Sequence, residues 1–275
     1  MLNYLKVDVI LNTQEKHAYD FLGSMLRGAF GVALKRVVCV NPKYICERCF
    51  SAPNCIYYDF FEIKNRFHLY RFSKPLKEQS YNFSFYLFEE ACAKLPYILN
   101  TFVEMLTKQG LGFERKKFGI SSIICNDQMV FQNGTFDISR IVAKNFEVDN
   151  IEKDVTLLLQ TPLRMKSDNR LLNKKPQLEQ ILSSILNRLN EFKGLPIVKL
   201  PFTPSYTEKQ NSIIFKDLTR LSNRQQTKME IGGIIGYIKY QDIDEKSYML
   251  LKLGEIIGVG KQTVFGLGEI KVEKF

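Results

Sequence analysis

Clustered cysteines are the residues whose chemistry is easiest to identify in this sequence. Four of them are spaced as C-x6-C-x2-C-x5-C, namely Cys39, Cys46, Cys49 and Cys55. Four thiolates hold zinc tetrahedrally, and a C-x2-C pair lets two nearby sulfurs reach one ion. The same spacing suits a four-iron four-sulfur cluster, and four ordinary buried cysteines are the third interpretation. We expect a structural zinc ion here, and we expect Cys92 and Cys125 to be core residues.

A second chemically suggestive stretch is "GVGKQTVFGLGEI", residues 258–270. It is not a Walker loop, because Gln262 follows Lys261, and it is not a dinucleotide fingerprint, because Thr263 replaces the third glycine. Its amides and its lysine could instead hold a chain of phosphates along an open loop. The alternative is a helix cap followed by a tight turn. The glycines concerned are Gly258, Gly260, Gly266 and Gly268.

A weaker copy of this stretch indicates that the chain is duplicated. Residues 106–125 and 253–272 both run from helical residues through Gly-x-Gly and Phe-Gly into an alternating strand. Each half then predicts strand, helix, strand, strand, helix, strand, which is the ferredoxin-like order. The expected elements cover 4–11, 17–36, 67–72, 81–88, 89–109 and 117–125, and then 154–165, 176–194, 212–222, 229–242, 245–258 and 266–275.

We therefore predict an α+β protein of two tandem ferredoxin-like, RRM-like domains. The first is expected over 1–130, with the Cys-rich metal-binding insertion at 39–55. The second is expected over 131–275, with the glycine-rich loop at 258–268. Residues 126–150 are expected to form a linker of extended character.

The charge of the chain favours a polyanionic partner. It has 39 Lys and Arg against 29 Asp and Glu, a formal net charge of +10 over 275 residues. Such a balance attracts nucleic acid and releases its counterions on contact. No run approaches the roughly eighteen apolar residues of a membrane helix, and the N-terminus does not resemble a signal peptide. We expect a cytoplasmic protein with no membrane partner.

Several stretches together resemble one family. They are "LRGAFGVALKR" (26–36), the four cysteines, "TPLRMK" (161–166), "SNRQQTKMEIGGIIGYIKY" (222–240) and the glycine-rich loop. This combination resembles the CRISPR repeat-RNA-processing endoribonucleases of the RAMP superfamily, the Cas-six-like family. The resemblance implies that precursor CRISPR RNA is cleaved without a catalytic metal, leaving a 2′,3′-cyclic phosphate. CRISPR effector or adaptation proteins are the further partners it implies.

The resemblance also implies which residues contact RNA. At the glycine-rich loop they are Gly258, Gly260, Lys261, Gly266 and Gly268, and along the RNA path they are Arg164, Lys166 and Arg224.

The catalytic group departs from the family pattern. Where relatives have histidine in "GAFGHAL", this chain has Val32. The catalytic candidates are therefore His68 and His17, the chain's two histidines, with Lys35 as a cation, and Arg36 and Arg66 as further cations.

Two other functions fit parts of the same sequence. A non-catalytic RAMP subunit that binds crRNA in an effector complex would share the fold, the charge and the glycine-rich loop. A metal-dependent redox or repair protein would use the cysteines.

Overall fold

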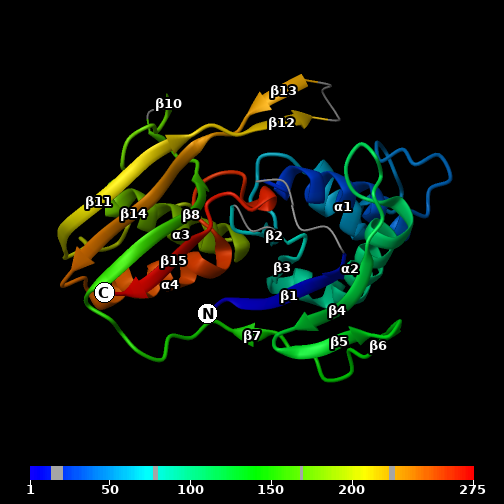
Figure 1. Ribbon diagram of the computed structural model, residues 1–275, viewed down its shortest axis with the longest axis horizontal. Helices are drawn as coiled ribbons and strands as arrows, with labels where there is room; N and C mark the ends of the chain where they lie inside the picture. The colour runs from blue at the N-terminus through cyan, green and yellow to red at the C-terminus, as the bar shows by residue number, and fades with distance from the viewer. Residues whose placement is uncertain (14–20, 77–79, 168–169, 223–226) are drawn as a thin grey trace. The chain divides into compact units, whose positions relative to one another are not determined.

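The computed structural model describes residues 1–13, 21–76, 80–167, 170–222 and 227–275. The chain divides into two compact units, Met1–Asn145 and Phe146–Phe275. Each unit contains its own antiparallel sheet and the helices that pack on it (Figure 1).

The first unit has the predicted order of elements. They are β1 (Asn3–Asn12), α1 (Gly23–Val38), β2 (Tyr70–Ser73), β3 (Phe83–Phe88), α2 (Leu95–Val103) and β4 (Gly119–Cys125). The strands lie in the order β2-β3-β1-β4, and neighbours are antiparallel. This is the ferredoxin-like arrangement, in which β3 lies between β1 and β2.

Short helical segments complete this unit. Two lie between α1 and β2, namely η1 (Ala52–Asn54) and η2 (Tyr58–Glu62). Two more adjoin α2, namely η3 (Glu89–Lys94) and η4 (Glu104–Gln109). The stretch 89–109, expected to be helical and to be interrupted or restarted at Pro96, consists of three consecutive segments, and Pro96 lies in the first turn of α2. That position suits proline because the first turn of a helix has no internal partner for its N–H.

The first unit extends further along the chain than the sequence indicated. Strand β5 (Gln128–Gln132) pairs with β4, β6 (Thr135–Phe136) pairs with β5, and β7 (Lys144–Asn145) pairs with β1. The boundary therefore falls after Asn145 instead of after residue 130, and much of the expected linker belongs to the first sheet.

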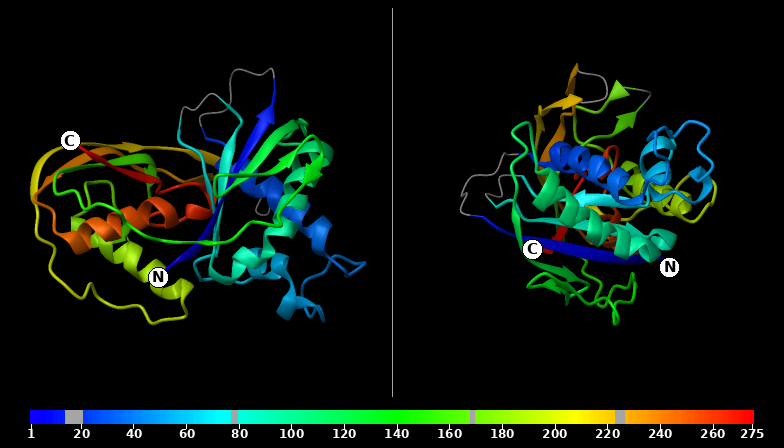
Figure 2. Two further views of the ribbon diagram at one scale, coloured as in Figure 1. Left: turned by 90° about the horizontal axis from the view of Figure 1, so that it is seen from below. Right: turned by 90° about the vertical axis from the view of Figure 1, so that its right-hand side faces the viewer.

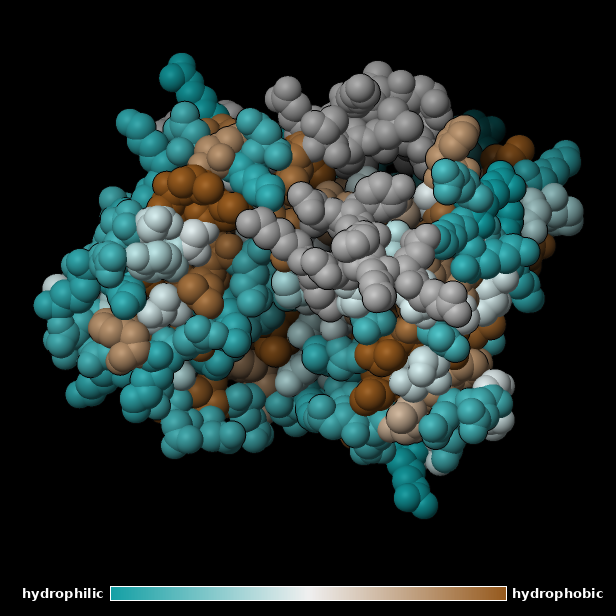
Figure 3. All heavy atoms as spheres, in the orientation of Figure 1, coloured by the Kyte–Doolittle hydropathy of each residue, from teal (hydrophilic) through white to brown (hydrophobic). Residues whose placement is uncertain are grey.

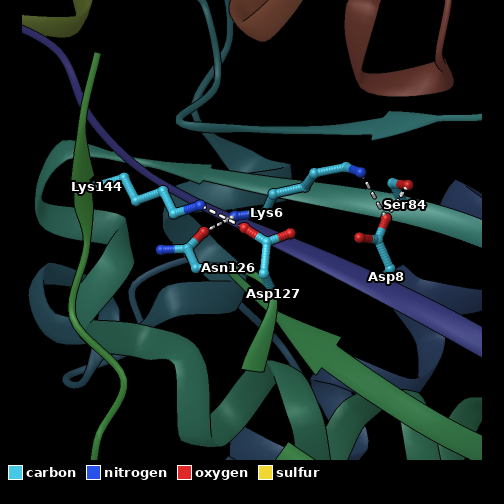
Figure 4. A network of polar contacts seen from close by, with 6 residues as sticks. All are labelled: Lys6, Asp8, Ser84, Asn126, Asp127 and Lys144. Carbon is cyan, nitrogen blue, oxygen red and sulfur yellow. Dashed lines mark hydrogen bonds and ion pairs between the residues drawn. The ribbon is translucent and has the colours of Figure 1, made fainter. Parts of the chain in front are cut away.

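Polar contacts explain this extension (Figure 4). Asn126 accepts a hydrogen bond from the Lys6 amide at 3.0 Å and donates one to the Val142 carbonyl at 2.9 Å. Asp127 forms an ion pair of 2.5 Å with Lys144 in β7. Asn126 and Asp127 both have positive φ, at 46° and 68°, as a two-residue hairpin turn between β4 and β5 requires.

The core of the first unit is aromatic. Along β1, alternate residues from Leu5 to Leu11 are buried and face the helices, while Lys6 and Asp8 lie on the other face. Phe30 of α1 lies 5.1 Å from Phe85 of β3 and 5.8 Å from Phe102 of α2, between ring centroids. These contacts place α1 and α2 on the same face of the sheet (Figure 2).

The second unit repeats the topology with an aliphatic core. Its main elements are β8 (Val155–Leu163), α3 (Leu178–Phe192), β11 (Thr207–Lys216), β14 (Gly233–Gln241), α4 (Glu245–Ile257) and β15 (Ile270–Lys274). The strand order β11-β14-β8-β15 corresponds to that of the first unit. At Gly254 a Cβ atom would lie 2.7 Å from Ile185 of α3 and 2.8 Å from Ile270 of β15, so α3, α4 and β15 pack closely there.

Smaller elements extend from this second sheet. Two hairpins are formed by β9 (Lys166–Ser167) with β10 (Arg170–Leu171) and by β12 (Thr219–Ser222) with β13 (Thr227–Glu230). A short helix, η5 (Thr263–Phe265), lies inside the glycine-rich loop.

The surface seen in Figure 3 is mainly hydrophilic and is interrupted by separate hydrophobic patches. Across the described parts of the chain, every helix is too short or too polar to span a membrane.

Candidate functional site

The glycine-rich loop follows α4 and leads into β15, as predicted. All four of its glycines have positive φ, between 67° and 79°. At Gly260 a Cβ atom would lie 2.5 Å from the Arg164 carbonyl oxygen, and at Gly268 it would lie 1.8 Å from that of Val259. The backbone therefore needs glycine here for conformational reasons. The presence of four glycines is therefore not by itself evidence that this loop contacts RNA.

Buried polar side chains hold this loop in place. Arg188 of α3 is 2% exposed and donates to the Thr263 hydroxyl at 2.7 Å and to the Gly260 carbonyl. Ser184, one turn earlier, accepts the Gly260 amide at 3.0 Å. The loop is thus fixed to α3 by side chains that the sequence analysis did not identify. The available signal was a charged residue among the apolar positions of the buried face of α3.

Strand β8 holds the other end of the loop. The Thr161 hydroxyl is buried, donates to the Gly266 carbonyl at 2.8 Å and accepts the Glu269 amide at 2.9 Å. The Gly268 amide donates to the Pro162 carbonyl at 3.0 Å. The loop is therefore a rigid connection between α4 and β15.

Lys261 is the exposed residue within this otherwise mostly buried loop. Its amide donates to the Arg164 carbonyl at 2.7 Å, so the structure brings these two predicted residues together. Lys166, which follows Arg164 by two residues, is also exposed. The Arg164 guanidinium donates to the Gly232 carbonyl at 2.8 Å, which fixes its position. Arg224 lies outside the described residues.

The corresponding loop of the first unit also turns on glycines. Gly110 and Gly112 have φ of 79° and 73°, close to the 75° of both Gly258 and Gly260. Between them and β4, the ring of Phe113 is fully exposed and is followed by the basic run 115–117. An exposed ring beside cations can stack on a nucleobase. Phe113 was not singled out from the sequence, because its importance depends on the exposure of its ring.

His68 lies in the first unit, just before β2, with two arginines and one carboxylate around it. Burial lowers the pKa of His68 to about 4, with smaller contributions from the positive charges of Arg27 and Arg66, while Asp59 opposes the shift. Arg66 is fixed by hydrogen bonds to the carbonyl of Asp59, at 2.8 Å, and to its carboxylate. The imidazole is therefore neutral at physiological pH, and the same burial and positive charges make it a weaker base than an ordinary histidine.

Segment η2 positions these groups against α1. The ring of Phe61 lies where a Cβ atom on Gly31 would be only 2.7 Å from it, so glycine at this position permits the contact. The guanidinium carbon of Arg27 lies 4.7 Å from the centroid of the Phe61 ring, and the Lys35 ammonium lies at the same distance from the centroid of the Tyr57 ring. Arg27 and Lys35 thus lie on the face of α1 that η2 covers. His68 and Lys35 both lie near η2. The structure records no direct contact between these two side chains.

The other catalytic candidates are placed differently. Val32 is 49% exposed on the outer face of α1, where the family pattern has histidine. Arg36 forms an ion pair of 3.6 Å with Glu104 of η4. His17 lies outside the described residues.

The six cysteines form two groups. Cys39, Cys46, Cys49 and Cys55 line one cavity of about 440 Å³ in the first unit. Within the described ranges, no three potential ligands are close enough to hold a metal ion as they stand. Cys125 is buried in β4 and Cys92 is half-buried in η3, and burial raises the pKa of each thiol to about 12.

Two protein families match this chain, one in each of its two compact units. Residues 2–145, more than half of the chain, match the AF_1859_N family, described as an N-terminal domain. Residues 157–270 match the family described as CRISPR-associated endoribonuclease Cas6. An uncharacterized protein of Archaeoglobus fulgidus is 24% identical, with 93% of each chain covered.

Solved structures share the whole fold at low identity. A product complex of Thermus thermophilus Cas6 has a TM-score of 0.58 at 13% identity, covering 99% of each chain. A second Cas6 product complex has a TM-score of 0.56 at 16% identity, covering 100% of each chain.

Proposed function

This chain belongs, by residues 2–145, to the AF_1859_N family. Because residues 157–270 match the Cas6 endoribonuclease family and the whole chain shares its fold with Cas6 structures, we propose that it is a Cas6-like RAMP protein that binds CRISPR repeat RNA and cleaves precursor crRNA. The observation that carries this proposal is a Cas6-like domain whose rigid glycine-rich loop exposes Lys261 beside Arg164. A lysine held on a rigid loop suits contact with a phosphate backbone.

We propose an RNA-contacting surface in each unit. In the second unit it comprises the loop glycines, Lys261, Arg164 and Lys166, with Arg224 as a further predicted contact. In the first unit it comprises Phe113, whose exposed ring can stack on an unpaired base.

The proposed reaction is attack of a ribose 2′-hydroxyl on the adjacent phosphate. The 2′ O–P bond forms, the P–O5′ bond breaks, the 2′ proton passes to a base and the departing 5′ oxygen takes a proton. The products are a 2′,3′-cyclic phosphate and a 5′-hydroxyl, and no metal takes part. Such a reaction needs a base, an acid and cations near the phosphorane.

We assign the base to His68 and the stabilising cations to Arg27 and Arg66. A phosphate bound between these arginines would offset their charge and raise the pKa of His68 from about 4, which makes the imidazole a better base. Lys35 and His17 remain further candidates. We propose that the protein acts in the cytoplasm, with CRISPR effector or adaptation proteins as partners.

One observation favours a second function. The exposed aliphatic side chain of Val32 stands where the family pattern has histidine, so the usual base is replaced by a group that cannot transfer a proton. The alternative is a non-catalytic RAMP subunit that binds crRNA in an effector complex.

Incubation of the protein with repeat RNA in EDTA separates the two. We expect one specific cut, abolished by a 2′-deoxy substitution at the scissile nucleotide and reduced at least about tenfold by His68→Gln. Arg140→Gln, an exposed arginine of the first unit, serves as the control and should cut normally. Tight binding of RNA that stays intact would instead support the non-catalytic subunit.

A further inference from the structure

The segment from Cys39 to Cys55 has no hydrophobic core of its own. None of the described residues from 39 to 55 is buried, and four large apolar side chains are 49% to 80% exposed, namely Val40, Tyr44, Ile45 and Phe50. The hydrogen bonds recorded within it are local, such as Cys49 amide to Cys46 carbonyl at 3.1 Å and Ala52 amide to Cys49 carbonyl at 3.1 Å. Local turns alone rarely hold a segment of this length in one conformation.

Its four thiols nevertheless share one space. All four cysteines of the segment line the same cavity of about 440 Å³, and Cys92 and Cys125 do not. Non-glycine residues with positive φ, Tyr44 at 54° and Arg48 at 56°, occur between them. Such conformations cost free energy and persist when something else constrains the backbone.

We propose that this segment binds one zinc ion through Cys39, Cys46, Cys49 and Cys55. Zinc prefers four thiolates in a tetrahedron at about 2.3 Å, and it gives small segments without a core their stability. Since no three of the potential ligands in the described residues are gathered at present, binding must draw the sulfurs inward, which couples metal binding to ordering of the segment. The thiols release their protons in the process.

The surroundings of the cavity suit the charge of such a site. Four thiolates and one zinc ion carry a net charge of −2, and Lys94 lies on the wall of the cavity. Zinc with four protein ligands has no open position, so its role is structural and it does not enter the proposed reaction. Its influence would pass through Tyr57 and Tyr58, which line the cavity and lead into η2.

Metal analysis of the full-length protein tests this proposal. We expect about one zinc per chain, lost in Cys46→Ser and in Cys49→Ser. Cys92→Ser is the matched control, because that thiol lies outside the cavity, and it should retain the metal. Removal of zinc with a chelator should lower the thermal midpoint of the wild type by at least about 4 °C.

A second measurement covers variants that fail to fold. Exchange of zinc for cobalt in the wild type should give the sulfur-to-metal charge-transfer absorption of four thiolates. A protein free of metal with four reactive thiols would overturn the proposal, as would a disulfide between these cysteines or iron with visible absorption that bleaches on reduction. None of these results depends on whether the protein cuts RNA.

Discussion

The pKa of about 4 at His68 makes this residue a source of pH-dependent stability. An unfolded chain protonates histidine near pH 6.5. Between pH 6.5 and 4 the unfolded state therefore binds more protons than the folded state, and stability falls as the pH falls. Above pH 6.5 both states are neutral at this site and the contribution is constant. The loss across this range is at most about 3 kcal/mol.

Denaturation of His68→Gln over the same pH range tests this shift. The variant should lose less stability than the wild type between pH 6.5 and 4, while His17→Gln, the other histidine variant, serves as the reference. Equal acid sensitivity of wild type and His68→Gln would show that the imidazole is not held neutral by its surroundings.

Residue types alone indicated some of these side chains and could not indicate others. Lys261 and His68 were predicted from their chemistry and from the resemblance, and their roles stay predictions. Arg27, Arg188 and Phe113 were not singled out, because their importance depends on burial, on exposure or on contact with residues far away in the sequence. Arg188 illustrates this, since its partners Gly260 and Thr263 follow more than seventy residues later.

At the scale of elements, α3 acts as the support of the glycine-rich loop. Ser184→Ala leaves the Gly260 amide without its side-chain acceptor, and we expect local opening of the loop to become easier by about 1 kcal/mol. Ser183→Ala changes the adjacent residue, for which the structure records no hydrogen bond to the loop, and should change it by less than about 0.5 kcal/mol. Arg188→Met removes two donors and should have the larger effect, about 2 kcal/mol.

Hydrogen exchange of peptides that span residues 258–268 measures this opening directly. Faster exchange in Ser184→Ala and Arg188→Met, with wild-type exchange in Ser183→Ala, is the expected pattern. Wild-type exchange in all three variants would show that the loop holds its conformation through its own backbone.

Hydrophobic periodicity predicted the order of the helices and strands, but it did not predict where the first unit ends. Alternation identified β1 and β8, and the apolar stripe identified α3, because each signal is local. Strands β5 to β7 were assigned to a linker, since their pairing with β4 and β1 depends on Asn126, Asp127 and Lys144 meeting across the first sheet. Such non-local contacts leave little trace in a single sequence.

At the scale of the molecule, one topology occurs twice with different cores. The strand orders β2-β3-β1-β4 and β11-β14-β8-β15 correspond, and the same Gly-x-Gly turn follows the second helix of each unit. The repeat was predictable because these glycines meet a backbone requirement that does not depend on the core. Gly119 shows where the likeness ends, since it lies in β4 without the positive φ of its counterpart Gly266.

The net charge of +10 and the two loops predict how RNA binding depends on salt. Lys261→Ala should lower affinity and reduce the slope of log K against log salt by about 0.7, because one contact with a single-stranded phosphate is lost. Phe113→Ala should lower affinity by about 1 to 3 kcal/mol and leave the slope unchanged, because stacking releases no counterions. Titrations by fluorescence anisotropy across a salt series measure both quantities.

Lys209→Ala is the matched control for Lys261, because Lys209 is equally a surface lysine but lies on β11, at the opposite edge of the second sheet from β15. It should leave the slope unchanged if the phosphates follow the glycine-rich loop. An equal decrease in both lysine variants would mean that RNA responds to total charge alone. In that case the contacts that hold the loop around Lys261 to Arg164 and α3 would stabilise the fold without contributing to RNA binding.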